Sequence, residues 1–358
     1  MIVEGAIFDA AGTRKAYVRF QRGRVVETGQ IGTDSTRGRV RRVRGIVVPP
    51  PVNAHTHLAD AIITREPPDR TLEEIVEPPD GIKFRALAET PPAQKRRAIH
   101  QALARMAREG IAATVDFREE GLAGVHLFHA AARGLAIRGL VLGRPLHRPI
   151  DEEELDAVVR ASDGIGISSA REENPSTRAK IARACRRQGK MYALHASEGI
   201  RERPEDYLAP RPDLLVHLTL ASRSDLEEVA ETRVPVAICP RSNALFGRRP
   251  DVALMELTGI RLLVGTDNAM FHAPSIWREI EFAYLTSRFA HRPASASYLA
   301  RAAFVEPWRW LGIPEVADIG SDSPISPLVI RLPTEDPAYQ LVTRVTEHLI
   351  MRPRPAAK

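Results

Sequence analysis

The sequence predicts an α/β protein, a (β/α)8 TIM barrel with a small β layer built from its N- and C-terminal segments. Short apolar runs alternate with helical segments eight times in succession, which is the pattern of a barrel of parallel strands. Most of these runs lack polar alternation, as expected for strands that are buried on both faces. A length of 358 residues suits one such barrel and an accessory layer.

The terminal segments form the accessory layer in this prediction. Residues 1–48 hold short strand-like runs separated by glycine-rich turns, and residues 327–332 are the one clear late strand. The chain is expected to fray from Met351 onwards. The expected parts are residues 1–48 and 318–334 for the β layer, 49–317 for the barrel and 335–358 for a C-terminal extension.

Each predicted barrel unit is a short apolar run, and a helical segment follows most of these runs. Glycines such as Gly110, Gly134 and Gly189 stop the helices. The expected strands are residues 46–48, 113–117, 138–143, 165–168, 191–194, 214–216, 235–238 and 261–264. The expected helices are residues 94–109, 123–133, 152–160, 176–188, 224–231, 252–257 and 275–289, and a further helix at 295–311 lies beyond the barrel.

The longest connection, residues 60–92, is rich in proline and charged residues. It contains one short helical segment, residues 72–76. Connections of this length inside a barrel are usually functional. We interpret the segment as a lid or substrate loop.

Histidine and aspartate residues follow several predicted strands at their carboxyl ends, where barrels of this class carry their active sites. His55 and His57 follow the first strand, and residues two apart on an extended chain point the same way. His195, His217 and Asp267 follow the fifth, sixth and eighth strands. Each alone has an ordinary structural explanation, such as a helix cap at Asp267. Together they predict a site for a divalent metal ion.

These motifs resemble the amidohydrolase superfamily, in particular its branch of cytosine-, guanine- and adenosine-type deaminases and triazine hydrolases. The resemblance spans nearly the whole barrel and implies a β-sandwich formed from the N- and C-terminal segments. It also implies one metal ion held by His55, His57, His195 and Asp267. The matching segments are Pro50–Leu58, Leu194–Glu198, Val216–His217, Cys239–Asn243 and Gly265–Asn268.

The number of metal ions follows from a departure from the binuclear members. Those members carry a lysine at the end of the fourth strand, which becomes carbamylated and bridges two ions. Here residues 167–170 read Ile-Ser-Ser-Ala, so a single ion is expected. Three imidazoles and one carboxylate suit zinc, and also iron(II) or manganese; we expect zinc.

Catalytic roles are expected for three of the residues. Asp267 can accept the proton of a water molecule whose pKa the ion lowers. Glu198 is placed like the superfamily's His-x-x-Glu glutamate, three residues past His195, to pass a proton to the ring nitrogen and the leaving amine. His217 would orient the water or stabilise the developing tetrahedral oxygen.

The sequence indicates the residues that contact the substrate less clearly than the metal ligands. Arg118 and Glu119 follow the second strand, although a surface ion pair is an equally good interpretation of them. Other candidate residues follow the third, seventh and eighth strands. The candidates are Arg118, Glu119, Arg144, His147, Arg241, Ser242, Asn243 and Asn268.

The predicted activity is metal-dependent hydrolytic deamination of an amino-substituted nitrogen heterocycle, such as a pyrimidine, purine or pterin. The alternative within enzymes is hydrolysis of a ring amide or a halogenated triazine at the same site. An alternative of another class is a non-catalytic binding protein on this fold. Such a protein would be expected to have lost ligands, and here all five positions are filled.

The amino-acid composition limits which binding partners and which cellular location are expected. The net charge is +6, but nearly all of the 51 basic residues are arginines spread along the chain among 45 acidic residues. No basic stripe interleaved with aromatic residues stands out, so nucleic acid is not an expected partner. No apolar run could span a membrane, and the start lacks a signal-peptide pattern. We expect a cytoplasmic protein that binds a small-molecule substrate, with a homodimer suggested by the family resemblance.

Overall fold

One sheet of nine strands carries the predicted histidines. The computed structural model describes residues 1–34, 40–66, 69–77 and 80–353. Neighbouring strands in the sheet follow the chain order closely. The strands are β5 (Val52–His57), β6 (Ala113–Arg118), β7 (Arg138–Gly143), β8 (Gly164–Ile167), β9 (Met191–Ala196), β10 (Leu214–His217), β11 (Val236–Ile238), β12 (Leu262–Val264) and β13 (Asp267–Asn268).

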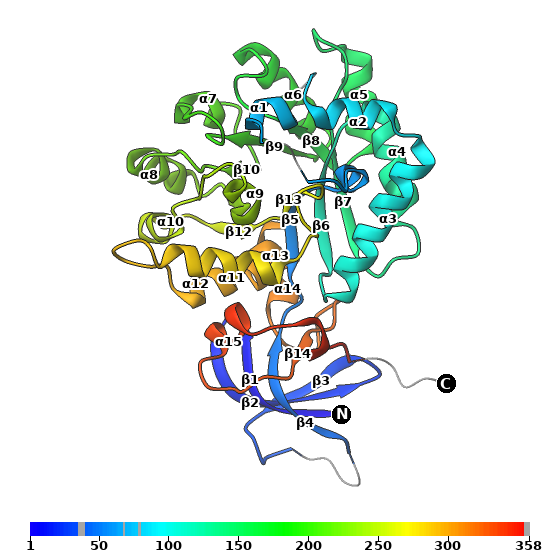
Figure 1. Ribbon diagram of the computed structural model, residues 1–358. Coiled ribbons are helices and arrows are strands. Elements are labelled where there is room, and N and C mark those ends of the chain that lie inside the picture. The colour runs from blue at the N-terminus through cyan, green and yellow to red at the C-terminus, as the bar shows by residue number, and fades with distance from the viewer. Residues whose placement is uncertain (35–39, 67–68, 78–79, 354–358) are drawn as a thin grey trace. The chain divides into compact units, whose positions relative to one another are not determined.

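This sheet curls into a TIM-barrel-like structure (Figure 1), which confirms the predicted α/β barrel. Neighbouring strands from β6 to β12 run parallel, and β13 pairs in parallel with β5. Only Gly265 and Thr266 separate β12 from β13, so the two edges of the sheet meet. Thr266 N donates to the His55 carbonyl at 3.0 Å. A Cβ atom on Gly265 would lie 2.6 Å from His55 Cβ, so only glycine fits at this closure.

The first barrel strand is not where the sequence predicted it. Residues 46–48 belong to β4 (Arg42–Val48), which lies in a different sheet, and the barrel strand is β5, after three prolines. His55 and His57 therefore lie inside the strand rather than after it. All six residues of β5 are buried, yet three of them are Asn53, His55 and His57. Its polar composition hides the strand from an apolar pattern.

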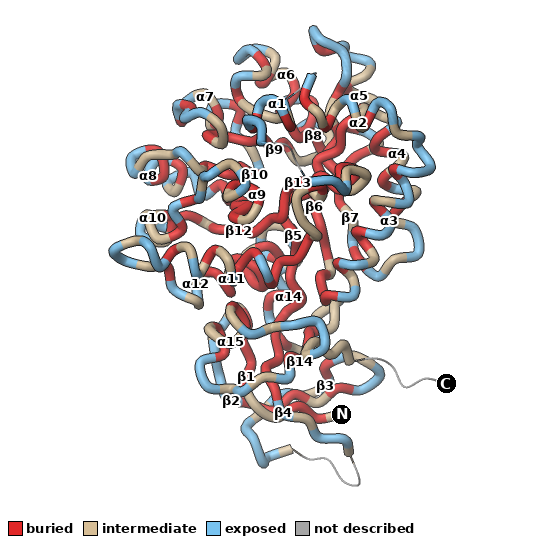
Figure 2. The backbone as a smooth tube through the Cα atoms, viewed as in Figure 1, coloured by how far each residue is buried: buried red, intermediate tan, exposed pale blue. Residues whose placement is uncertain are grey.

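The helices that follow the strands begin within two residues of the predicted positions. Side-chain caps explain this agreement, because Asp151, Asn174, Ser222 and Asp251 each accept a backbone N–H in the first turn of a helix. Buried strands and the exposed outer faces of these helices are seen in Figure 2. The helices are α3 (Pro92–Arg108), α4 (Gly121–Ala132), α5 (Glu152–Ala161), α6 (Pro175–Arg187), α8 (Arg223–Thr232) and α10 (Val252–Thr258), with shorter α7 (Pro204–Leu208) and α9 (Pro240–Ala244).

The long connection between β5 and α3 is more ordered than predicted. The expected short helix is present as α1 (Leu72–Val76), which begins with a capping box of Thr71 and Glu74. A 3-10 helix, η1 (Leu58–Ile62), precedes it and α2 (Ile82–Glu89) follows it. Residues 67–68 and 78–79 of the predicted lid lie outside the described residues.

The terminal segments form a second sheet of six strands, ordered β15–β14–β4–β1–β2–β3. As predicted, strands from both ends of the chain pair, with Leu328–Ile330 lying antiparallel to β4. The sandwich stays a prediction, since the described residues of both termini make this one sheet. The strands besides β4 are β1 (Ile2–Asp9), β2 (Gly12–Gln21), β3 (Arg24–Gly29), β14 (Leu328–Ile330) and β15 (Ile350–Met351).

Two details near the C-terminus correct the prediction. Met351 is not frayed, because it pairs with Val329 in the sheet; residues 354–358 lie outside the described part. The helix expected at 295–311 is broken at Val305, because Pro307 lacks the N–H that a continuous helix would need. The helices here are α11 (Ile276–Ser287), α12 (Ala296–Phe304), α13 (Glu306–Trp310), α14 (Pro314–Ala317), α15 (Pro337–Thr343) and the 3-10 helix η2 (Glu347–Leu349).

The contacts divide the chain into two units, and the predicted domain boundaries stay a prediction. One unit is Met1–Val52, Arg108–Ala112 and Ile276–Lys358; the other is Asn53–Ala107 and Ala113–Ser275. An apolar cluster that includes Val18, Phe20 and Val47 forms a core of the first unit. Within the described residues, no helix has the length and apolar character needed to cross a lipid bilayer.

Candidate metal centre and active site

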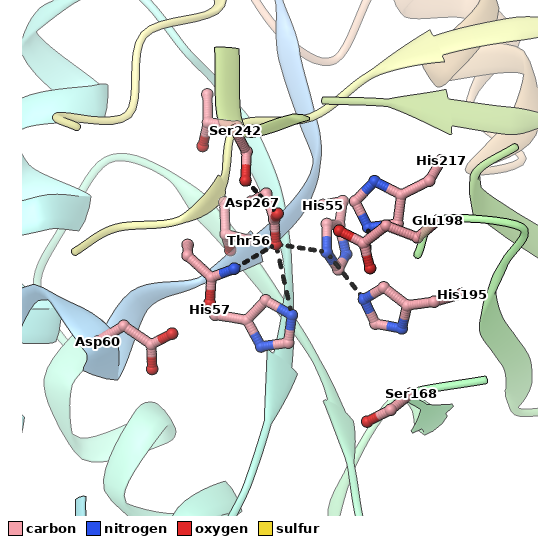
Figure 3. A network of polar contacts seen from close by, with 12 residues as sticks. His55, Thr56, His57, Asp60, Ser168, His195, Glu198, His217, Ser242 and Asp267 are labelled. Atoms are coloured by element: carbon pink, nitrogen blue, oxygen red, sulfur yellow. Dashed lines mark hydrogen bonds and ion pairs between the residues drawn. The ribbon is translucent and has the colours of Figure 1, made fainter. Parts of the chain in front are cut away.

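Four side chains bring a nitrogen or oxygen atom to one point at the carboxyl ends of β5, β9 and β12 (Figure 3). His55 Nε2 lies 3.2 Å from both Asp267 Oδ1 and His195 Nε2. His57 Nε2 lies 3.6 Å from the same Asp267 oxygen. Ligand atoms about 2.1 Å from a tetrahedral ion are separated by about 3.4 Å. The spacing of these donors therefore fits a zinc-sized ion.

The state of the imidazoles also suits ligation. Burial is the main reason that the pKa of each of these histidines lies below its ordinary value, and for His195 the neighbouring imidazoles lower the pKa further. Neutral imidazole is the form that binds metals. His195 Nδ1 lies 2.9 Å from the Ile167 carbonyl, which can only accept. The proton is therefore on Nδ1, and Nε2 presents its lone pair to the cluster.

His217 forms a compact group with His55, His195 and Asp267, whose ligand-type atoms all lie within 4.8 Å of one another, and His57 is not in this group. The hydrogen bonds of His217 nevertheless assign it a different state from the ligand candidates. Asn243 accepts from the Thr219 hydroxyl through Oδ1, so its amide nitrogen donates to His217 Nδ1. The proton of His217 is then on Nε2, which lies 3.4 Å from Glu198 Oε2.

Two acids at the site have pKa values shifted in opposite directions. Burial, with the charge of Asp267 added, raises the pKa of Glu198 well above its ordinary value. Burial would also raise the pKa of Asp267, but the hydrogen bond with His55 and the nearby imidazoles hold it well below. Ser242 Oγ donates to Asp267 Oδ2 at 2.5 Å and fixes the carboxylate. The raised pKa favours the protonated form of Glu198, and the lowered pKa favours the ionised form of Asp267.

A cavity of about 610 Å³ opens onto these groups. Its inner end is formed by His57, His195, Glu198, Asp267 and Asn268. Helices α1 and α2 and residues that follow β6, β7, β8 and β9 supply the rest of its wall. Residues of that wall include Leu72, Glu73, Val76, Lys83, Phe84, Arg144, Ser168, Arg171, Glu172 and Ile200.

Of the predicted substrate contacts, Arg144, Asn268 and Glu119 line the cavity. Arg144 donates to the Ser168 hydroxyl at 2.5 Å and pairs with Glu172. Asn268 donates to Asp267 Oδ1 at 3.1 Å.

The other candidates lie behind or away from the cavity. Ser242 binds Asp267, which lines the cavity, whereas Asn243 binds His217, which is not part of the cavity wall. Arg241 is partly buried on α9 and is not part of the cavity wall. His147 has a largely exposed side chain that pairs with Glu154 at 2.9 Å.

Arg118 and Glu119 form the ion pair that the sequence offered as an alternative, but the pair is buried rather than on the surface. Arg118 also lies 3.1 Å from Asp116 Oδ2. Asp116 in turn accepts from the backbone N of Leu58 at 2.7 Å and from Thr56 Oγ1 at 2.9 Å. This group supports the strand that carries the two histidines.

Two buried residues behind His57, Lys83 and Asp60, were missed by the sequence analysis. Lys83, on α2, is 3% exposed, and its ammonium nitrogen lies 2.5 Å from Glu119 Oε1 and 3.1 Å from Asp60 Oδ2. Those two acids raise the pKa of Lys83 despite its burial, so it stays charged. One signal was available. In a chain that uses arginine for most of its 51 basic residues, a lysine marks a position that suits a compact charge.

Replacing Arg118 with methionine is expected to destabilise the metal-free protein by about 3–5 kcal/mol, because Asp116 and Glu119 would lose a buried counter-charge. Urea unfolding followed by circular dichroism measures this. Arg160→Met, at an exposed position on α5, is the control, expected to change stability by no more than about 0.5 kcal/mol. Equal stability of the two variants would contradict the supporting role of Arg118.

The end of β8 agrees with a single ion. Ser168 stands there, and its hydroxyl and backbone N–H bind Arg144 and Glu172. A serine cannot supply the bridging carboxylate that a carbamylated lysine provides in a binuclear centre.

Comparisons with known proteins agree with this arrangement. The family model described as "Amidohydrolase family" matches residues 46–313. A protein of Methanothermobacter thermautotrophicus named "Putative aminohydrolase" is 36% identical over 263 residues, which are 68% of each chain.

Two solved structures share the fold. An adenosine deaminase from Xanthomonas campestris with bound zinc has a TM-score of 0.81 at 18% identity, covering 99% of this chain and 92% of that one. A guanine deaminase from C. acetobutylicum with bound guanine has a TM-score of 0.79 at 14% identity, covering 98% and 97%. The chain thus belongs to the amidohydrolase family and is a metal-dependent hydrolase that acts on carbon–nitrogen bonds.

Proposed function

We propose that this protein hydrolytically deaminates an amino-substituted nitrogen heterocycle, with one divalent ion, zinc, bound by His55, His57, His195 and Asp267. The separations of 3.2, 3.2 and 3.6 Å among their donor atoms carry the proposal. Lone pairs from neutral imidazoles and one ionised carboxylate match the ligand set of catalytic zinc. The wall around this site has many charged and polar side chains and a few apolar ones, among them Leu72, Phe84 and Ile200, and such a wall suits a polar small molecule.

The reaction replaces a ring amino group with oxygen and consumes one water molecule for each ammonia released. The bound ion would lower the pKa of the attacking water towards neutrality. Asp267 then takes the proton of this water as it adds to the ring carbon. Protonated Glu198 gives its proton to the adjacent ring nitrogen, then takes the proton of the new hydroxyl and passes it to the departing amine, which leaves as ammonia. The proton held by Asp267 restores Glu198. His217 Nε2–H donates to the oxygen on which charge develops.

Heterocycle deamination is supported by two acids at the same end of the cavity whose pKa values are shifted in opposite directions, Glu198 upwards and Asp267 downwards. Addition of water to an aromatic carbon requires a proton to enter the ring nitrogen while another leaves the water. The raised pKa of Glu198 and the lowered pKa of Asp267 suit these two roles. The printed names of the fold relatives, adenosine and guanine deaminase, point to the same class of substrate.

The test is a panel of purines, pyrimidines and pterins assayed for ammonium with protein of measured metal content. Release of ammonium in proportion to bound zinc is the expected result. Chloride from a halogenated triazine, or an opened ring amide, would instead favour the alternative reaction at the same site. Metal-free protein that turns over none of these compounds would favour a non-catalytic binding role.

A further inference from the structure

Lys83 stands at a junction of four groups behind the proposed ligand His57. Its ammonium nitrogen lies 2.5 Å from Glu119 Oε1, 3.1 Å from Asp60 Oδ2 and 3.4 Å from Asn268 Oδ1. It also lies 3.1 Å from His57 Nδ1. The same ring nitrogen is 2.9 Å from Glu119 Oε1. His57 Nδ1 can therefore either donate to Glu119 or accept from Lys83, and the two choices give opposite tautomers.

The positions and charges of the neighbours favour donation to Glu119. Glu119 Oε1 can only accept, and it lies closer to His57 Nδ1, at 2.9 Å, than Lys83 Nζ does, at 3.1 Å. An ionised carboxylate is also a stronger acceptor than a neutral imidazole nitrogen, so the ammonium of Lys83 directs its protons to Glu119 and Asn268. Asp60 pairs with the ammonium by charge and accepts no hydrogen bond from it. His57 Nδ1 then donates to Glu119, which leaves Nε2 with a free lone pair on the side of Asp267.

We propose that Lys83 is a positioning residue of the metal centre, which acts through Glu119 to hold His57 in the tautomer that can ligate. The inference rests on the proposed function, because it takes His57 as a ligand. Groups that bind the outer nitrogen of a ligating histidine fix its ring and tune metal affinity. Here the carboxylate that does so is itself held by a lysine.

Lys83 also connects helix α2 to the strands that carry the proposed ligands. Asp60 follows β5, Glu119 follows β6 and Asn268 lies in β13, whereas Lys83 belongs to α2. Its neighbour Phe84 lines the substrate cavity. The ammonium therefore ties the connection that forms one cavity wall to the strands that carry the ligands.

The tautomer can be measured on metal-free protein by long-range nitrogen–proton NMR with 15N-labelled histidine, assigned with a His57→Gln variant. We expect His57 to carry its proton on Nδ1. A proton on Nε2 would overturn the inference. This result requires neither zinc nor substrate. Failure of the wild-type protein to bind zinc would instead count against the proposed function.

The second measurement is the zinc dissociation constant of Lys83→Met by competition with a chelator. We expect affinity to fall by about 10–100-fold, whereas Lys95→Met should bind zinc within about twofold of the wild type. Lys95 is a matched control, since it is 4% exposed and pairs with Glu120, the residue that precedes α4, and no contact with His57 is seen among the described residues. Equal affinities of the two variants would overturn the inference.

A double-mutant cycle separates positioning from general destabilisation. If Lys83 acts through Glu119, adding Glu119→Gln to Lys83→Met should weaken zinc binding little further. Independent, additive losses would contradict the proposed route. Should Lys83→Met fail to fold because Asp60 is left unpaired, the same cycle is run in an Asp60→Asn background, which removes that buried charge.

Discussion

Replacing Asp267 with asparagine is expected to lower kcat for ammonia release by about 10⁴-fold, the upper end of what a general base contributes. The carboxylate has two tasks that a neutral amide cannot perform. Its Oδ1 faces His55 at 3.2 Å and His57 at 3.6 Å as part of the donor cluster, and it is the ionised group available to take a proton from water. The variant should also retain less zinc after dialysis against a chelator.

Asp251→Asn is the matched control for this substitution. Asp251 caps the first turn of α10 by accepting from Leu254 N, and asparagine is an equally good cap. This control should keep both its activity and its zinc. If Asp267→Asn retained a tenth of the wild-type rate with its metal bound, the role assigned to Asp267 would be wrong.

The barrel could be predicted because its signals are local. Apolar runs give the buried strands β7 to β12, and caps such as Asn174 and Ser222 set where helices begin. The proposed ligands could be predicted as a set because parallel strands deliver their carboxyl ends to one rim of a barrel. His195 and Asp267 are therefore found without knowledge of any contact between them.

The failures come from partners that are distant in the sequence. Strand β5 was misplaced because its buried polar residues bind groups that are distant in the sequence, as when Asn53 donates to Thr266 Oγ1 at 2.8 Å. The role of Lys83 depends on Glu119 and Asn268, which follow it by 36 and 185 positions. A hydropathy pattern holds no trace of such pairings, so the layer of charges behind the ligands became visible only in the structure.

Replacing Glu198 with glutamine is expected to lower kcat by about 10²–10⁴-fold while zinc stays bound. Glu198 contributes a proton rather than a lone pair, since burial and the charge of Asp267 raise its pKa well above its ordinary value. Because Glu198→Gln should keep its zinc, its loss of kcat can be distinguished from that of Asp267→Asn, which should also lose zinc.

The pH dependence has a definite sign. A proton donor with a raised pKa works below that pKa and loses its proton as the pH rises through it, so the wild-type rate should decline on the alkaline side. Glutamine cannot lose a proton in this range, so Glu198→Gln should lack that decline, as rate measurements over a range of pH would show. Glu205→Gln, at an exposed position on α7, should keep the wild-type profile. If Glu198→Gln turned over at the wild-type rate, the proton on the ring nitrogen would have to come from another group, and His217, 3.4 Å away, would be the one to replace next.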